Sequence, residues 1–405
     1  MLKLLKRVVN LTLCLVIGLT AYSVWLNKKL PDTFMVPRGQ ALALAQLPWL
    51  QPLKMEGSTA AQTVQPGSSY NVTLSLFGKI PVKTVRAVAV DRRAVTVCGI
   101  PFGIKMFSEG AMVVGFTDIY TESGYQNPAK KAGLCMGDSI LRMDSLSTHG
   151  NEDVSLAIRG SKGRTIQVEF LRSGKVHTTQ LQPVQDSSHK RWQAGMWVRD
   201  SSAGIGTLTF VDNAKGVYGG LGHPISDSDT GQCVNLREGE IAPVTIKDCK
   251  PGQAGAPGEL KGRFMLAPPM GDITVNDETG VYGHIQVLMK GQDMPVAQAQ
   301  EVCRGAAKIY TTIDGNTPRW YRVQIEKLSL GENDPNRNMI LRVDDPALLA
   351  KTGGIVQGMS GSPIVQNGHL VGAVTHVFVN DPTRGYGIFA ENMLKTADRA
   401  QRKAA

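Results

Sequence analysis

The segment from Gly353 to Gly387 constrains this chain more than any other stretch of its 405 residues. Gly358 and Gly361 bracket a serine and permit a tight turn, because glycine adopts backbone conformations that other residues avoid. Pro363 opens an apolar run, and Asn-Gly at 367–368 is a turn signal before a second apolar run. The segment therefore predicts a serine on a tight turn that leads into β-strands.

A serine in such a turn becomes a nucleophile only with help from its neighbours. Its hydroxyl needs an adjacent base, and the developing oxyanion needs backbone donors. The N–H groups of Gly358 and Ser360 could converge on one oxygen. Among the seven histidines, His223 stands in the glycine-rich run from Gly216 to Pro224. A histidine in a turn is more often a solvated polar residue than a base, so its position alone leaves its role open.

The N-terminus carries an apolar run between basic residues. The run from Val8 to Leu26 is long enough to cross a hydrocarbon core of ~30 Å as a helix. A cleaved signal peptide has a similar order, but no small-x-small cleavage motif follows this run. We therefore expect residues 1–30 to be a retained membrane anchor, with the N-terminus in the cytoplasm and the rest of the chain outside it.

Two further units precede the glycine-rich half of the chain. Residues 31–92 contain several prolines, which predicts a linker or stalk with short strands at Tyr70–Phe77 and Val82–Val90. Residues 93–184 resemble a PDZ domain, since a helical stretch leads through Gly133-Leu-Cys-Met-Gly-Asp into a strand, and a second helix and a hairpin follow.

PDZ domains bind an extended peptide as an added strand. The resemblance places that peptide beside a loop near Gly103 and Ile104. The alternative is that this unit only spaces and orients its neighbour.

Composition favours a mainly β chain and excludes several classes of function. Glycine is abundant, at 44 residues, while aromatic residues make up only 6%. The formal charge of +10 is concentrated at the two ends of the chain, so a nucleic-acid-binding surface is not supported. The six cysteines form no CxxC pair and no zinc-like set, so we expect no metal and assign no disulfide.

Together these features resemble the stage IV sporulation protein B family, the signalling serine peptidases of endospore-forming bacteria. The serine turn, the Asn-Gly turn and the run Leu-Val-Gly-Ala-Val-Thr are also similar to the second barrel of chymotrypsin-like serine peptidases. The resemblance implies a chymotrypsin-like double β-barrel over residues 190–400, after the anchor and the PDZ-like α+β domain.

The resemblance also implies the site residues. Ser360, rather than Ser362, is the expected nucleophile, because the family's serine is followed by glycine. His223, in a Gly-His-Pro motif, is the expected base, and Asp345 the expected third member. Thr375 is expected on the strand that pairs with the substrate, although threonine also simply favours strands.

The third member of the triad remains open at the level of sequence. Asp345 lies much closer in sequence to Ser360 than to His223, unlike the aspartate of ordinary chymotrypsin-like enzymes. Aspartate, here preceded by Asp344, is also favoured as a turn residue before a proline. Asp227, Asp229 or some other polar group are alternatives for orienting the histidine.

The resemblance implies a cofactor-independent endopeptidase anchored in the membrane, in the space between forespore and mother cell. It implies self-cleavage in the N-terminal region and cleavage of a membrane-bound regulator. That cleavage releases an intramembrane metallopeptidase, which processes the late mother-cell sigma factor. The alternative function is a non-catalytic PDZ-containing scaffold with a peptidase-like barrel, and the intact serine motif argues against it.

Overall fold

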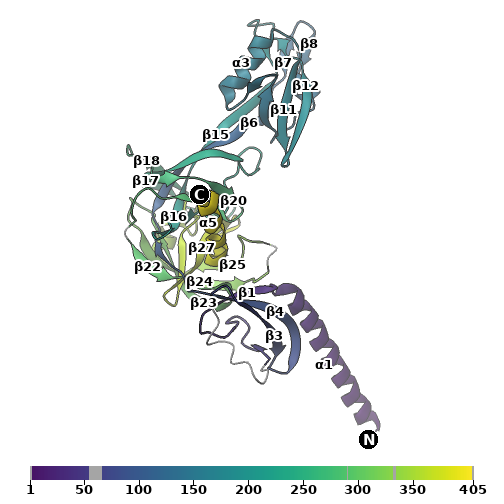
Figure 1. The fold of residues 1–405 in the computed structure, drawn as a ribbon, viewed down its shortest axis with the longest axis vertical. Helices are drawn as coiled ribbons and strands as arrows, with labels where there is room; N and C mark the ends of the chain where they lie inside the picture. The colour runs from purple at the N-terminus through teal and green to yellow at the C-terminus, as the bar shows by residue number, and fades with distance from the viewer. Residues whose placement is uncertain (1, 54–65, 290, 332–333, 404–405) are drawn as a thin grey trace.

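A computed structural model describes residues 2–53, 66–289, 291–331 and 334–403. Part of the expected linker, residues 54–65, lies outside them. The molecule is elongated and mainly β (Figure 1), as composition and resemblance predicted. A small unit lies at one end, two β-barrel units form the middle, and a four-stranded sheet with a long helix forms the other end.

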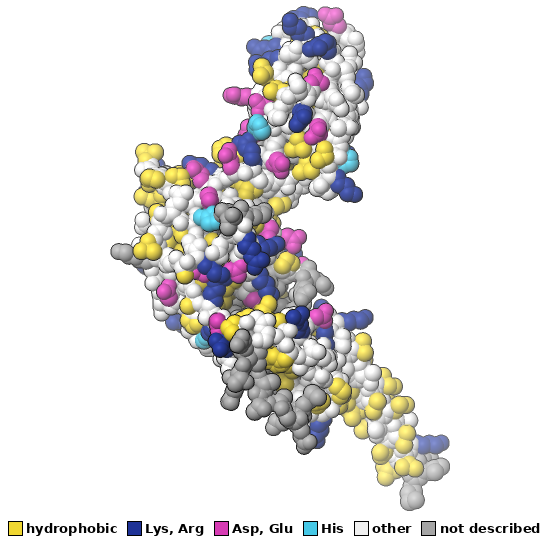
Figure 2. All heavy atoms as spheres, in the orientation of Figure 1, with side chains coloured by type: hydrophobic (Ala, Val, Ile, Leu, Met, Phe, Trp, Pro, Cys, Tyr) yellow, Lys and Arg dark blue, Asp and Glu magenta, His cyan; other side chains and the backbone are white. Residues whose placement is uncertain are grey.

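The N-terminal helix α1 (Leu2–Lys29) is long and apolar enough to cross a membrane. Its apolar side chains are exposed along most of its length, and Figure 2 shows them covering the free part of the helix. Its last turn is docked, because Leu26 and Leu30 are buried against the adjoining sheet. The Lys83 ammonium donates to the carbonyls of Asn27 and Leu30, which satisfies two acceptors at this helix end.

The expected stalk contains a folded sheet, which differs from a linker with little structure. The strands are β1 (Thr33–Pro37), β2 (Leu50–Pro52), β3 (Ser69–Leu76) and β4 (Ile80–Val90), in the order β1-β4-β3-β2. The last two coincide with the strands expected there. The apolar residues between the prolines form a core, with Leu42 and Leu44 buried beside Phe34, Leu74 and Val85. This core packs on the end of α1, so the helix and the sheet form one unit.

Two long strands run through both the first barrel unit and the small unit at the far end. They are β6 (Pro101–Phe116) and β15 (Met196–Asp212), which pair antiparallel along most of their length. The barrel-side half of β6 also pairs with β17 (Leu236–Lys250), whereas its distal half pairs with β9 (Ser139–Met143). The small unit is therefore an insertion into the first barrel unit.

We call this insertion, residues 110–199, the PDZ-like unit. Its core joins Ala111 and Val113 of β6 to Ile140, Val154 and Phe170. Its remaining elements are β7 (Ile119–Thr121), β8 (Gly124–Gln126), α2 (Pro128–Lys131), β10 (Leu146–Ser147), α3 (Asn151–Ser161), β11 (Ile166–Arg172), β12 (Lys175–Leu181), β13 (Val184–Gln185) and β14 (Trp192–Gln193). Residues 94–107, expected in this domain, lie in the barrel instead.

The prediction of a peptide-binding loop at Gly103 and Ile104 is wrong. Both residues are buried in the middle of β6. Gly103 is paired with Ile205 on one side and Ala242 on the other, and Ile104 is likewise flanked on both sides. Because both edges of β6 are occupied here, no peptide strand can be added at this point.

The first barrel unit is a curled half-barrel whose strands share one sheet with the PDZ-like unit. Its core contains Phe102, Leu208, Tyr218 and Val281. The strands besides β6, β15 and β17 are β5 (Ala94–Val97), β16 (Val217–Gly220), β18 (Glu259–Phe264), β19 (Gly271–Asp272), β20 (Val275–Asp277), β21 (Gly280–His284) and β22 (Gln292–Pro295).

The second barrel is closed, in the order β23-β24-β25-β28-β27-β26. Its elements are η1 (Ala299–Glu301), β23 (Gly305–Thr311), β24 (Arg319–Leu328), β25 (Met339–Val343), α4 (Pro346–Thr352), β26 (Pro363–Gln366), β27 (His369–Phe378) and β28 (Asp381–Phe389). Helix α5 (Ala390–Lys403) buries Met393, Ala397 and Ala400 against both barrel units, which confirms the expected packing of the C-terminal helix.

Candidate active site

Ser360 stands on a loop that is held from two sides, just before β26. Gly361 donates from its N–H to Val374 O of β27 at 2.7 Å, and Thr207 of β15 donates from its N–H to Ser360 O at 2.9 Å. Both loop glycines, Gly358 and Gly361, have positive φ angles of 95° and 94°. A Cβ on Gly361 would lie 1.9 Å from Thr207 O, so no other residue fits there.

The carbonyls of this loop point at β15. The Thr207 hydroxyl donates to Gly358 O at 2.9 Å, and the Thr209 hydroxyl donates to Gly361 O at 2.7 Å. The N–H groups of Gly358 and Ser360 donate no hydrogen bond to any residue that the structure describes. Two free N–H groups beside a serine are the donors that an oxyanion needs.

The structure distinguishes the two serines of the motif. Ser362 is fully buried, and its hydroxyl donates to Met359 O at 2.6 Å. Ser360 is only partly buried, and its Oγ donates to Thr375 O of β27 at 2.6 Å. Of the two, Ser360 is the one that lines a cleft.

His223 follows β16 on a second loop that packs against the serine loop. Leu221 and Gly222 both have positive φ angles, which turns the chain sharply after the strand. A Cβ on Gly222 would lie 2.9 Å from Thr375 Cγ2, so the histidine loop rests directly on β27. Leu221 also donates from its N–H to Thr207 O at 3.4 Å, so Thr207 contacts both loops.

The hydrogen bond of His223 defines its tautomer. Its Nδ1 lies 2.8 Å from Pro224 O, and because a carbonyl only accepts, Nδ1 carries the proton. Nε2 is then left with a lone pair, as a general base requires. Burial lowers the pKa of His223, and the hydrogen bond to Pro224 offsets this only in part. His223 is therefore a neutral imidazole near neutral pH.

A second imidazole lies beside the first. The ring centroids of His223 and His376 are 4.6 Å apart, with the rings tilted by 33°. Burial first, and then the charges of His223 and Arg337, lower the pKa of His376 to about 4. Its Nδ1 is buried without a hydrogen-bond partner in the described parts of the chain. His376 was not among the residues expected at the site, although its position directly after Thr375, in an apolar strand, could have indicated it.

A bulge in β27 brings Thr375 and His376 to the cleft. The register between β27 and β28 shifts between Val374 and Val377, so an extra residue is accommodated there. The Thr375 hydroxyl donates to Asn336 O at 2.9 Å, while Thr375 O receives the Ser360 hydroxyl. Thr375 therefore holds the nucleophile through its backbone.

These residues surround one cleft of about 500 Å³ between the two barrel units. His223, Ser360, Thr375 and His376 line it, together with Gly358. One wall is the segment of β15 at residues 202–205, and the opposite wall is the outer part of β27. The structure thus brings together the expected base, nucleophile, oxyanion donors and substrate strand.

Asp345 is not part of this cleft. Its Oδ1 accepts hydrogen bonds from the N–H groups of Ala347 and Leu348 and caps helix α4, and its Oδ2 accepts from Arg322 N at 3.1 Å. In the described residues its carboxylate makes no hydrogen bond to His223. This arrangement corresponds to the alternative stated above, in which Asp345 is simply a residue favoured before a proline. Its carboxylate accepts hydrogen bonds from the first turn of the helix that begins at that proline.

The two other aspartates considered as orienting groups are also engaged elsewhere. Asp227 is buried, and its carboxylate pairs with the Arg199 guanidinium. Asp229 pairs with the same guanidinium at 2.6 Å. The group that orients His223 in this structure is the carbonyl of Pro224.

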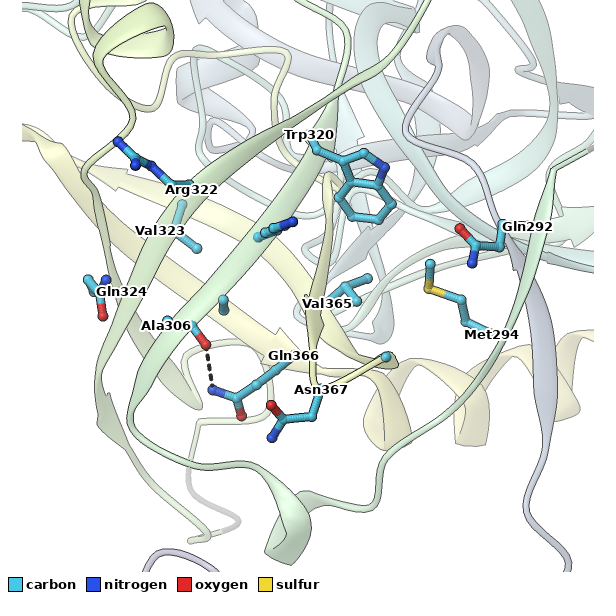
Figure 3. Close-up of a pocket in the computed structure, with 13 residues that line it drawn as sticks. Gln292, Met294, Ala306, Trp320, Arg322, Val323, Gln324, Val365, Gln366 and Asn367 are labelled. Atoms are coloured by element: carbon cyan, nitrogen blue, oxygen red, sulfur yellow. Dashed lines mark hydrogen bonds between the residues drawn. The ribbon is translucent and has the colours of Figure 1, made fainter.

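A different pocket, of about 450 Å³, lies on the second barrel and contains none of the expected catalytic residues (Figure 3). Its amide Gln366 already donates to Ala306 O, as the dashed line shows, and to Cys303 O. Its indole, Trp320, stacks on Tyr310 with centroids 4.4 Å apart. The amide and the indole of this pocket are thus engaged in contacts within the barrel, so the candidate site is the cleft between the barrels.

One comparison with known proteins covers the part of the chain that contains these residues. The family model of the SpoIVB peptidase S55 matches residues 190–394, which include His223, Thr375 and Ser360. No curated protein matches the chain. Among the solved structures, the PDZ domain of an SdrC-like protein from Listeria monocytogenes is 15% identical, with a TM-score of 0.18. The match covers 22% of this chain and 87% of that one. Because the family model spans half of the chain, the chain belongs to the SpoIVB peptidase S55 family of serine peptidases.

Proposed function

We propose that this protein is a membrane-anchored serine endopeptidase in which Ser360 is the nucleophile and His223 the general base. The observation that carries the proposal is the shared cleft. In it, a neutral histidine with a free Nε2 lies beside a serine whose loop offers two unpaired N–H groups. Each part corresponds to one requirement of acyl transfer: a base, a nucleophile and oxyanion donors.

The reaction begins with a movement of the serine hydroxyl. In the structure Ser360 Oγ donates to Thr375 O, so it must rotate away from that carbonyl to reach Nε2 of His223. His223 then takes the proton as Oγ attacks the peptide carbonyl, and the N–H groups of Gly358 and Ser360 stabilise the oxyanion. His223 returns the proton to the leaving amine, and water attacks the acyl-enzyme by the reverse sequence.

The substrate is a protein segment in extended conformation, lying between β15 and the bulged part of β27. By the family resemblance, the targets are the protein's own N-terminal region and a membrane-bound regulator. Cutting that regulator would release an intramembrane metallopeptidase and so start sigma-factor processing in the mother cell. The location that goes with these targets is the space between forespore and mother-cell membranes, with α1 as the anchor.

A serine-reactive phosphonate probe tests the catalytic part of this proposal. Full-length protein in detergent should be labelled, whereas Ser360→Ala should not, and His223→Ala should be labelled far more slowly. Ser362→Ala is the matched control, because Ser362 is buried and faces away from the cleft. Wild-type labelling no stronger than that of Ser360→Ala would leave the non-catalytic scaffold as the better explanation.

A further inference from the structure

A basic cavity lies where the end of α1 meets the second barrel. It has a volume of about 420 Å³. From α1 it is lined by Trp25, Leu26 and Lys29, and from the barrel side by Arg304, Lys327, Arg337 and Tyr386 among others. We infer that this cavity binds the phosphate headgroup of an anionic phospholipid from the membrane that α1 crosses. The inference rests on the membrane anchor of the proposed function but on none of its catalytic residues.

The charge of the cavity is strongly unbalanced. Among the residues that the structure describes, the basic ones that line the cavity are Lys29, Arg304, Lys327 and Arg337, and the acidic one is Asp334. Over the described ranges, the side chains of Lys29, Arg304 and Lys327 make no ion pair and no hydrogen bond. Several unpaired cations around one concave site favour a multiply hydrogen-bonding anion such as a phosphate.

Arg337 is held in place by an aromatic ring. Its guanidinium lies 5.2 Å from the ring centroid of Tyr386, which also lines the cavity. A cation over an aromatic face keeps its charge and its N–H donors available to a ligand. The cavity therefore presents one oriented guanidinium together with three cations that have no partner in the described chain.

The aromatic residues around the cavity place it at the level of lipid headgroups. Tyr22 and Trp25 stack on α1 with centroids 5.9 Å apart, and Trp49 Nε1 donates to the Tyr22 hydroxyl at 3.3 Å. Trp25 is 53% exposed. Tryptophan and tyrosine concentrate at membrane–water interfaces, and Trp25 follows a run of apolar helix about as long as a hydrocarbon core.

The base of the cavity is apolar and rigid. Leu26 and Leu30 are buried against the sheet, and Leu330 of the barrel packs on the same cluster. Lys83 and Val82 of β4 fasten this end of the helix through hydrogen bonds to Asn27 and Leu30. A lipid bound here could place its phosphate among the four cations and its glycerol and upper acyl chains along this apolar base, a combination that a free phosphate does not use.

Native mass spectrometry of the full-length protein tests the inference. Protein in detergent, with α1 verified by intact mass, is titrated with phosphatidylglycerol and separately with phosphatidylcholine. We expect one phosphatidylglycerol to be retained in preference to phosphatidylcholine. The double variant Arg304→Gln, Lys327→Gln should weaken this binding roughly 30-fold, since each basic residue near an anionic lipid contributes a factor of about five. Both side chains are exposed, so the variant should fold.

The control is a double variant of equal charge, Arg142→Gln with Lys175→Gln, on exposed residues of the PDZ-like unit at the far end of the molecule (Figure 1). It should bind like the wild type. Equal retention of the two lipids, or equal loss in both double variants, would overturn the site. Binding of inorganic phosphate that displaces phosphatidylglycerol at equal concentration would show a free-phosphate site instead and also overturn it.

Two further results separate this inference from the proposed function. Ser360→Ala should retain the lipid fully, because Ser360 lies in the other cleft. If α1 is found removed from the mature protein, the anchor and the lipid site fail together. The phosphonate labelling of Ser360 would still decide the peptidase proposal on its own.

Discussion

At the scale of single residues, the orientation of the proposed base, His223, is the point where this site departs from the usual triad. An aspartate normally accepts the Nδ1 proton of the histidine and holds its tautomer. Here Nδ1 of His223 donates to the carbonyl of Pro224, the residue that follows it in the chain. The histidine is therefore oriented by its own loop, and a second imidazole, His376, lies beside it.

The first prediction separates capping from catalysis at Asp345. Asp345→Asn should keep kcat/KM within a few-fold of the wild type, because the carboxylate contacts the N-terminus of α4 rather than His223. Asp345→Ala should lower the free energy of unfolding by about 1 kcal/mol through loss of the helix cap. Urea unfolding and peptide hydrolysis measure the two effects. A loss of kcat of about 10⁴-fold in Asp345→Asn, with stability unchanged, would restore the orienting role.

The second prediction concerns His376 as a positioning residue. His376→Ala removes the ring that packs on His223 and should lower kcat by ~10–100-fold with little change in KM, because the base loses its position. His376→Phe keeps a ring of similar shape and should restore most of the activity. If the phenylalanine variant is as slow as the alanine variant, a nitrogen of His376 takes part in the chemistry itself.

The third prediction is the pH dependence of cleavage. Burial lowers the pKa of His223, so the base stays unprotonated to a lower pH than a free histidine. Activity should therefore rise with pH through a midpoint below the ordinary value of 6.5, as kcat/KM of the free enzyme reports. His376, with a pKa of about 4, should stay neutral throughout this range. A midpoint at or above 6.5 would contradict the lowered pKa of His223.

At the scale of elements, strand β15 organises the site although it supplies none of the expected catalytic residues. Its Thr207 accepts from the histidine loop and donates to the serine loop from both its N–H and its hydroxyl. Its Thr209 holds the next carbonyl of the serine loop. The histidine loop and the serine loop come from different barrel units. Because β15 is hydrogen-bonded to both loops, it fixes the distance between them.

The fourth prediction tests this role of β15. Thr207→Val keeps the shape and the backbone hydrogen bonds but removes the hydroxyl that donates to Gly358 O. The loss should lower the free energy of unfolding by about 1 kcal/mol and the rate of phosphonate labelling by roughly tenfold. Thr245→Val, on the half-buried face of β17, is a control with the same chemical change outside the cleft. Equal labelling rates in the two variants would show that Thr207 does not position the oxyanion donors.

The same elements show what sequence could predict and why. The serine and histidine turns could be predicted from the sequence, because glycine marks sharp turns locally, as at Gly222, Gly358 and Gly361. The contact between the two loops could be predicted only through the family resemblance. The hydrogen bond from His223 to Pro224 O could not be predicted, since backbone hydrogen bonds depend on the folded path of the chain rather than on residue type. The prediction of a loop at Gly103 was wrong, because the sequence of a strand that is paired on both edges looks the same as that of any other apolar segment.

At the scale of the whole molecule, the four units follow one another in space in an order that the chain does not follow in sequence. The chain leaves the first barrel unit along β6, builds the PDZ-like unit, and returns along β15 to complete that barrel (Figure 1). The strand that enters and the strand that returns are the only two that belong to both units among the described residues. β15 therefore runs without interruption from the PDZ-like unit to Thr207, which is hydrogen-bonded to both the serine loop and the histidine loop.

This arrangement predicts where the PDZ-like unit can be removed. Ser108 Oγ donates to Asp200 O at 3.2 Å, so the two long strands lie side by side at the border between the units. Replacing residues 109–199 by Asn-Gly should close β6 and β15 into a hairpin and leave the barrels folded, with phosphonate labelling of Ser360 within a few-fold of the wild type. Deleting residues 93–184 instead removes β5 and the whole of β6, so β15 and β17 lose their shared partner strand and the first barrel should unfold. Thermal unfolding and labelling of both chains decide between these outcomes. If the hairpin chain is unfolded as well, the PDZ-like unit is part of the barrel's own stability rather than an insertion into it.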